Sequence, residues 1–445
     1  MPAKPQKVKQ SLRASFWDGF FASIQFGIVE QFAVPLALFL GANSAAIGIL
    51  NFVRNAFVSI IQVESADLTN WLRSRKKLIL ISVFLAAFLW LPTYFLPFLF
   101  PNYKVAVFIV FFALASAFNM LPTPAWASLM AEYIPHNKRG TYFGWRSSVM
   151  GIVYTGAVLL AGLVLYFARP IGLFWGFAFL ILVASLSRFI SFYFLTKMYE
   201  PKWRVASTDY FSLYSFLIRI KQSNFARFVV LSSLFVLAVA LVSPFFALYL
   251  LQDLRYDYLS FTLVIGAAVV TTFVTQRYWG GLADTYGNMK LIRLTVFLIS
   301  LLPFLWLFSR SFAYLFVVQL FGGFVWAGFN LSSTNFIYDA AVSNKRERCI
   351  AYYNFLSGLG LAFGALLGGF LYRNLPLLAG YQFYSLLIIS GLLRFVFALA
   401  IFSFTKEVRA VQDIRVRTLL FGLSGLRAVG LLSRELIYRR KRSKK

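Results

Sequence analysis

The chain has 445 residues, of which 60% are apolar and 13% are charged, and its formal net charge is +28. A soluble protein of this size carries about a quarter charged residues, so the composition excludes an ordinary soluble fold and indicates an integral membrane protein. The chain has one cysteine, Cys349, and one histidine, His136, which exclude an internal disulfide and a site built from several such ligands. We expect no metal and no cofactor.

Long apolar runs predict the transmembrane helices. A helix needs roughly 20 apolar residues to cross the hydrocarbon layer, and backbone exposed to lipid must satisfy its own hydrogen bonds. Twelve such runs follow in chain order, at about 16–40, 44–65, 78–100, 105–131, 142–168, 171–197, 226–252, 259–282, 290–309, 312–338, 349–372 and 380–405. The predicted fold class is therefore an all-α membrane protein with twelve transmembrane helices.

The basic residues lie in alternate loops. They cluster near residues 73–77, 138–139, 202–221, 290–293 and 345–348 and at both ends of the chain, whereas the other loops carry few. Cytoplasmic loops carry such an excess of lysine and arginine, so we expect both termini to be cytoplasmic, in a protein of the plasma membrane. Because the charge follows the loops, its expected partners are anionic lipid headgroups rather than nucleic acid.

A more polar stretch divides the twelve runs into two sets of six. The predicted organisation is a cytoplasmic tail over 1–15, a six-helix bundle over 16–199, a cytoplasmic linker over 200–225, a second bundle over 226–405 and a basic tail over 406–445. In the linker, Leu213, Phe216, Leu217 and Ile220 recur at helical spacing and predict a short helix on the membrane surface. The tail alternates leucines with arginines, which favours an interfacial amphipathic helix; a disordered basic tail is the alternative.

One pattern occurs twice along the chain. Glu132 is followed seven positions later by Arg139, and Asp339 is followed by Arg346 at the same spacing, 207 residues further on. An echo across half of a membrane protein indicates an internal duplication. The two sets of six helices are therefore expected to form two pseudo-symmetric bundles.

A second motif lies at the end of the eighth run, where Gly280, Asp284, Gly287 and Lys290 are spaced within Gly-Gly-Leu-Ala-Asp-Thr-Tyr-Gly-Asn-Met-Lys. This segment resembles the loop motif of the major facilitator superfamily, and the repeated acid and arginine resemble a second element of that family. In the first half the motif is degraded, with Asn70 in the place of Asp284 and Arg73 in the place of Gly287. The resemblance covers about residues 14–405.

The resemblance implies an alternating-access transporter, in which two halves rock about a site near the middle of the membrane. Charge pairs at the cytoplasmic rim can be made and broken during such a motion. We predict an inner gate formed by Asp284, Glu132, Arg139, Asp339 and Arg346, with Gly280, Gly287 and Lys290 shaping its loop. In the alternative interpretation these residues only fix loops and orientation, since surface ion pairs often contribute little.

Charged residues deep inside the predicted helices mark the candidate substrate site, because a charge in the membrane is costly. Glu30 and Arg54 fall near the middle of the first and second runs, and Arg394 falls near the middle of the twelfth. We predict that these three residues serve substrate binding or proton coupling. The alternative is a static Glu30–Arg54 pair that only holds two helices together. Arg188, 206 residues before Arg394, lies nearer the cytoplasmic end, from which a long side chain can snorkel.

The sequence thus favours a monomeric, proton-coupled secondary transporter of a small organic solute. A non-transporting sensor on the same fold is the alternative, since the basic tail could serve as an output element. A membrane-embedded enzyme has the weakest support, because no converging set of acids, histidines or metal ligands and no phosphate-binding loop occurs in the sequence.

Overall fold

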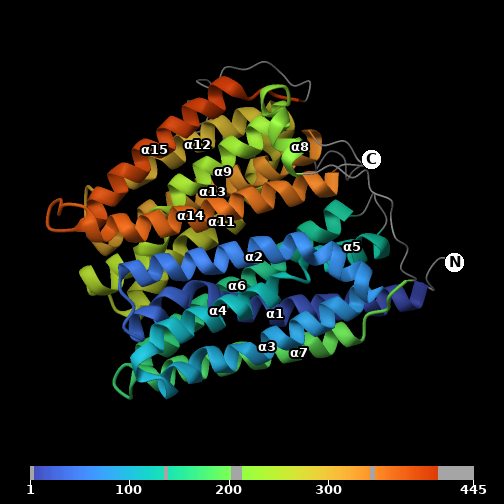
Figure 1. Cartoon of the computed structure of the whole chain (residues 1–445), viewed down its shortest axis with the longest axis horizontal. Coiled ribbons are helices and arrows are strands. Elements are labelled where there is room, and N and C mark those ends of the chain that lie inside the picture. The colour runs from blue at the N-terminus through green and yellow to red at the C-terminus, as the bar shows by residue number, and fades with distance from the viewer. Residues whose placement is uncertain (1–4, 135–138, 202–212, 341–345, 409–445) are drawn as a thin grey trace, which may run out of the picture.

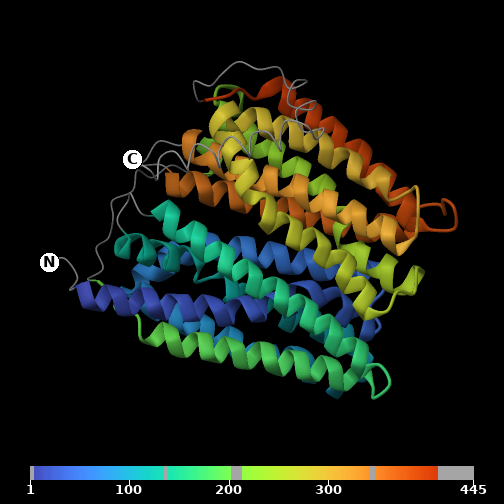
Figure 2. The same ribbon diagram turned by 180° about the vertical axis from the view of Figure 1, so that it is seen from behind.

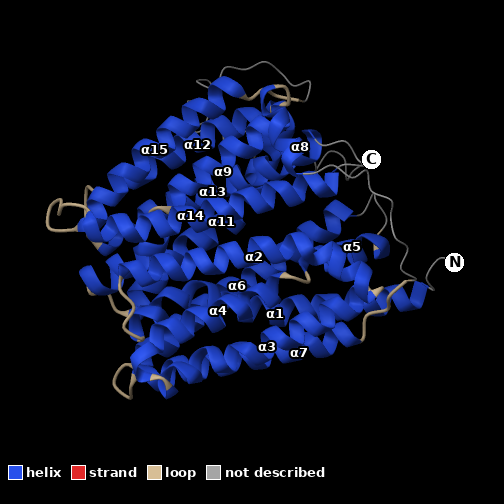
Figure 3. Ribbon diagram, in the orientation of Figure 1, coloured by secondary structure: helices blue, strands red, loops and turns tan. Residues whose placement is uncertain are grey.

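The structure is a computed structural model, and it describes residues 5–134, 139–201, 213–340 and 346–408. Helices joined by short connections make up nearly all of this part (Figure 3). The helices of the first half are α1 (Pro5–Phe39), α2 (Ser44–Leu72), α3 (Arg75–Leu99), η1 (Pro101–Tyr103), α4 (Lys104–Met120), α5 (Thr123–Tyr133), α6 (Arg139–Ala168) and α7 (Leu173–Thr196). Those that follow are α8 (Leu213–Ile218), η3 (Arg219–Lys221), α9 (Asn224–Ala240), η4 (Ser243–Phe245), α10 (Phe246–Leu248), η5 (Tyr249–Asp253), α11 (Tyr258–Tyr286), α12 (Asn288–Leu305), α13 (Phe312–Ala340), α14 (Arg346–Asn374) and α15 (Gln382–Phe404).

Twelve helical segments of the described chain are long and apolar enough to cross a membrane, which confirms the predicted fold class. The first six and the last six form two separate bundles, one below the other in Figure 1. Because the number of spans is even, the beginning of α1 and the end of α15 lie on the same side. We call this side the inner side, which the charge bias predicts to be cytoplasmic, and the opposite side the outer side.

Prolines explain where two of the spans depart from a single helix. The fourth span is divided into α4 and α5 around Pro122 and Pro124, and the seventh is divided after Ala240, ahead of Pro244. Proline has no N–H group and cannot continue the hydrogen-bond ladder of a helix. Beyond its break, the seventh span continues as a 3-10 turn, one α turn and the π-helix η5. The predictions of these spans as single runs thus missed both breaks.

Side-chain caps explain where several of the helices begin. The Asn43 side chain accepts a hydrogen bond from the backbone N–H of Ala46, and Ser74, Ser223 and Asp257 do the same for α3, α9 and α11. Such caps satisfy N–H groups that have no partner within the helix. The α1 helix begins at Pro5, so most of the predicted basic tail continues the first helix.

The apolar core consists of one cluster that both halves share and further clusters that each belong to one half. One cluster combines residues of both halves, including Phe32 of α1, Phe261 of α11 and Tyr249 of η5, and it lies in the outer part of the molecule. Further clusters toward the inner side each belong to one half, such as Leu129 and Met130 of α5 in the first and Phe228 and Phe336 in the second. The halves therefore share a core on the outer side and keep separate cores on the inner side.

Two pairs of long helices form the seam between the halves. The α2 helix packs along α14 and the α6 helix packs along α11; Figure 2 shows the two halves from behind. The linker helix α8 does not lie on the surface alone, because Phe216 is buried against Phe225 and Tyr352 of the second half. Residues 1–4, the linker residues 202–212 and the predicted amphipathic tail beyond residue 408 lie outside the described residues.

Candidate functional site

The Glu30–Arg54 pair lies in the middle of the first half. Arg54 Nη2 of α2 donates to Glu30 Oε1 of α1, and the two side chains are 18% and 26% exposed. Glu30 lies nine residues before the end of α1 and Arg54 ten residues after the start of α2. At 1.5 Å per residue both are about 14 Å from the outer ends of their helices, which is roughly half the thickness of the hydrocarbon layer. The two charges thus meet near mid-depth.

Neighbouring polar groups extend this pair within the first half. Gln31 Nε2 donates to the Tyr154 hydroxyl of α6 at 2.9 Å, and the Arg54 guanidinium lies 5.8 Å from the centre of the Phe112 ring. A carboxylate and a guanidinium that remain partly exposed, next to an aromatic face, can receive a small polar solute.

The inner end of the first half is held by a network that the sequence did not predict. Arg75, at the start of α3, is buried and its Nη1 donates to Glu132 Oε1 of α5 at 2.6 Å. Glu200 closes the other side of Arg75, because its carboxylate accepts the backbone N–H groups of Arg75 at 2.7 Å and Lys76 at 3.2 Å. Its second oxygen accepts the Ser74 hydroxyl at 2.5 Å. A carboxylate at this point also matches the positive end of the helix dipole.

The inner end of the second half has a similar arrangement, with an asparagine at the start of the helix in place of the arginine. Asn288, at the start of α12, donates to Asp339 Oδ2 at 2.7 Å, and Glu407 Oε2 accepts the backbone N–H of Met289 at 2.7 Å. Glu200 and Glu407 are separated by 407 − 200 = 207 residues, the same offset as Glu132 and Asp339. The repeat could therefore have revealed both capping glutamates from the sequence.

The predicted gate residues are only partly brought together. Glu132 and Asp339 each form the bonds described above inside their own half. Asp284 is exposed near the end of α11, one turn after Gly280, and Lys290 follows on α12. The side chains of Arg139 and Arg346, at the starts of α6 and α14, lie outside the described residues. The role of these residues as an inner gate stays a prediction.

The two loop motifs differ at one backbone position. Gly287 joins α11 to α12 with a φ of 88° and a ψ of 155°, a conformation that is essentially restricted to glycine. At the matching corner of the first half, Arg73 takes the left-handed conformation, with a φ of 51° and a ψ of 27°. A residue other than glycine can adopt this conformation at a modest cost. The turn that Gly287 was predicted to permit is present.

The other deep arginines lie inside their bundles. Arg188 of α7 is 5% exposed, so it does not snorkel, and it donates to the Ser191 hydroxyl at 3.1 Å. Ser191 in turn donates at 2.7 Å to Asp18 of α1, whose other oxygen lies 3.9 Å from Arg146 of α6. This buried group was missed because Asp18 lies close to the basic N-terminal segment. Arg394 of α15 is 4% exposed, and its predicted substrate role stays a prediction.

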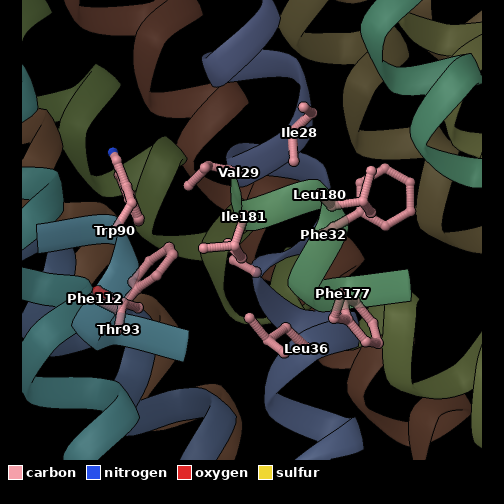
Figure 4. Close-up of a pocket in the computed structure, with 11 residues that line it drawn as sticks. Ile28, Val29, Phe32, Leu36, Trp90, Thr93, Phe112, Phe177, Leu180 and Ile181 are labelled. Carbon is pink, nitrogen blue, oxygen red and sulfur yellow. The ribbon is translucent and has the colours of Figure 1, made fainter. Parts of the chain in front are cut away.

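A small apolar cavity lies in the outer part of the first half, among α1, α3, α4 and α7 (Figure 4). Its lining includes Val29, Phe32, Trp90, Phe112 and Phe177. Val29 precedes Glu30 and Phe112 lies under Arg54, so the cavity is adjacent to the ion pair. In the described part of the chain, no cluster of three or more histidine, cysteine or acidic side chains could hold a metal ion.

Two six-helix halves and a seam between them define a polytopic membrane protein. Residues 228–433 match the family model of the Major Facilitator Superfamily, which covers most of the second half. No curated protein matches the chain. Together with the fold of the whole chain, the family match confirms the predicted resemblance to the major facilitator superfamily.

Solved structures share this fold at low sequence identity. A crystal structure of a mutant of the nucleoside transporter NupG superposes with a TM-score of 0.71 at 13% identity, covering 88% of this chain and 100% of that chain. The D-xylose-proton symporter gives 0.68 at 13% identity, covering 91% and 99% of the two chains. A bacterial homologue of the iron transporter ferroportin in an inward-facing state gives 0.66 at 13% identity, covering 91% and 100%. At this identity the likeness establishes the fold.

Proposed function

We propose that the chain is a secondary transporter that moves a small polar organic solute by alternating access, coupled to protons. The observation that carries this proposal is the Glu30–Arg54 pair at mid-depth between α1 and α2. A carboxylate at this depth is costly, and a functional role is the default explanation for an ionisable group inside the membrane. Protonation of Glu30 would free Arg54 and so link proton uptake to a rearrangement of the site.

Alternating access is supported by the division of the core. The halves share an apolar cluster on the outer side, so this end is closed. On the inner side each half has its own cluster, so the halves can separate there. Several of the similar structures are described as inward-facing or inward-open, among them the ferroportin homologue and the xylose transporter XylE from E. coli. In the opposite state the inner ends would close, and we propose Asp284, Glu132, Arg139, Asp339 and Arg346 as that gate.

The chemical class of the solute is supported by the groups around the pair. Gln31 and Tyr154 offer a hydrogen-bonding amide and hydroxyl, and Phe112 offers an aromatic face. The similar structures include a nucleoside transporter and a D-xylose-proton symporter, so both a small polar solute and a proton have precedent on this fold. We further propose that the protein acts as a monomer in the plasma membrane, with both termini inside and the basic segments on anionic lipid.

The test is uptake into proteoliposomes from a panel of nucleosides, sugars and other small solutes, with and without an imposed pH gradient. The native chain should accumulate at least one solute in response to the gradient. Glu30→Gln should abolish accumulation and retain gradient-independent exchange, because the neutral amide keeps the shape and cannot carry a proton. Glu64→Gln is the matched control, since Glu64 is an exposed acid on the same helix as Arg54, outside the pair.

Full gradient-driven uptake by Glu30→Gln would show that Glu30 is not the proton carrier. Saturable ligand binding without flux for every solute would instead favour the sensor.

A further inference from the structure

Arg394 is a buried cation that lies near the middle of α15 and whose hydrogen bonds go to backbone carbonyls. It is 4% exposed, its Nη1 donates to the Ile299 carbonyl at 3.3 Å and its Nη2 to the Val239 carbonyl at 3.5 Å. The acids of the second half whose side chains the structure describes lie at helix ends and loops, at Asp253, Asp257, Asp284, Asp339 and Glu407. Arg188, the counterpart in the first half, reaches Asp18 through Ser191. The hydrogen-bond acceptors of the Arg394 guanidinium are therefore backbone carbonyls.

The two carbonyls belong to places where helices are interrupted. Pro303 lies four residues after Ile299 inside α12, and its missing N–H leaves the Ile299 carbonyl without its helical partner. Val239 lies in the last turn of α9, where the seventh span breaks. Ser390, one turn before Arg394 on α15, donates to the neighbouring Ala238 carbonyl at 2.6 Å. The Val239 carbonyl also accepts the Val242 backbone N–H at 3.2 Å, so Arg394 is its second donor. Water cannot satisfy a freed carbonyl within the hydrocarbon layer, and the Ile299 and Ala238 carbonyls accept from side chains instead.

The opposite face of α9 is held by α14. A Cβ atom added to Gly360, Gly364 or Gly368 would lie 2.5, 2.3 or 2.1 Å from the carbonyl oxygens of Ser233, Leu237 and Leu241. The glycine ladder thus packs backbone on backbone inside the second half. The α9 helix is fixed by α14 on one side and by α15 on the other, up to the point of its break.

Beyond the break, the chain turns to the other half. We call residues 243–253, comprising η4, α10 and η5, the outer segment. In it, η4 contacts α2 and α10 contacts α1 of the first half, and Tyr249 and Leu250 are buried in the shared core. The outer segment is therefore the part of the seventh span whose position closes the outer side.

We propose that Ser390 and Arg394 form a carbonyl clamp that fixes the break of the seventh span and so positions the outer segment against the first half. Both are positioning residues, because their contacts are backbone carbonyls of their own half. This assigns Arg394 a role other than the substrate contact predicted from the sequence. Of the two measurements below, only the uptake rate rests on the proposed transport function. The position of the outer segment can be measured without transport.

The experiment measures maleimide labelling of single cysteines in a Cys349→Ser background in detergent. Leu250→Cys reports on the outer segment, because Leu250 is buried in the shared core, and Asn102→Cys, an exposed site on the outer side of the first half, is the reference. Arg394→Met should raise labelling at position 250 about tenfold, the change that corresponds to about 1.4 kcal/mol, and leave position 102 unchanged. Arg394→Lys and Ser390→Ala should give smaller increases, because each keeps part of the clamp. Ser403→Ala should give none, since Ser403 bonds within its own helix.

In proteoliposomes the same variants should lower the maximal uptake rate and leave KM within about twofold of the native value, which is expected when substrate contacts are intact. Unchanged labelling at position 250, or an equal rise at both positions, would overturn the clamp. A raised KM with unchanged labelling would also overturn it in favour of a substrate contact. If Arg394→Met does not fold, Arg394→Lys and Ser390→Ala decide by the same readout. If the native chain transports nothing, the labelling result still decides the clamp and only the proposed function fails.

Discussion

Replacing Gly48 or Gly369 by alanine tests whether the α2–α14 seam is the closed outer contact. A Cβ atom at Gly48 would lie 2.9 Å from the Ala365 carbonyl oxygen and 3.0 Å from Gly369 Cα. A Cβ atom at Gly369 would lie 2.9 Å from Gly48 Cα. These neighbours are backbone atoms, which cannot rotate away, so the two helices must separate by about 0.5 Å to reach an ordinary contact distance.

Of the two effects of the substitution, only overpacking changes the ratio of the two states. Alanine favours a helix over glycine by about 1 kcal/mol in every state of the protein. Overpacking costs about 1 to 3 kcal/mol, and here it acts only in the state in which α2 and α14 touch. The ratio of outer-closed to outer-open molecules should therefore fall by about 5-fold to 150-fold. Gly156→Ala is the matched control, because a Cβ atom at Gly156 has no neighbour within 4 Å.

Pulsed electron paramagnetic resonance measures this shift between spin labels at Asn102 and Asn374, which are exposed toward the outer ends of the two halves. In a Cys349→Ser background, Gly48→Ala and Gly369→Ala should each add a longer distance to the distribution. Gly156→Ala should leave the distribution unchanged and raise the melting temperature. An unchanged distribution in both seam variants, or the same shift in the control, would refute the reasoning.

Two further predictions concern the inner side. Glu200→Gln should destabilise the protein by about 0.5 to 2 kcal/mol, because the Glu200 carboxylate accepts two backbone N–H groups and a hydroxyl at the start of α3. Thermal unfolding in detergent measures this loss, and an unchanged melting temperature would contradict it. Asp284→Asn should lower the transport rate more than the melting temperature, because the gate role is electrostatic; equal losses would support a purely structural role.

The candidate site was partly readable from the sequence. Glu30 and Arg54 were identifiable because charged residues are rare in apolar runs, and their pairing follows from the short connection between α1 and α2. The partner of Glu132 was not identifiable, because Arg75 begins α3 and Glu132 lies in α5, two helices that are not consecutive in the chain. A repeat at 207 residues reports which positions are equivalent and says nothing about which side chains meet.

Hydropathy and the repeat were enough to determine the class of protein, the twelve spans and the division into two halves, because the bilayer imposes length and apolarity on each helix separately. Only the tertiary structure decided the surroundings of Arg394, which depend on how α15 is rotated against α9 and α12. It also decided that the glycine ladder of α14 packs within one half, whereas Gly48 and Gly369 meet across the seam. The rotation of a helix about its axis depends on contacts among residues far apart in the chain. The hydropathy of a single span does not predict these contacts.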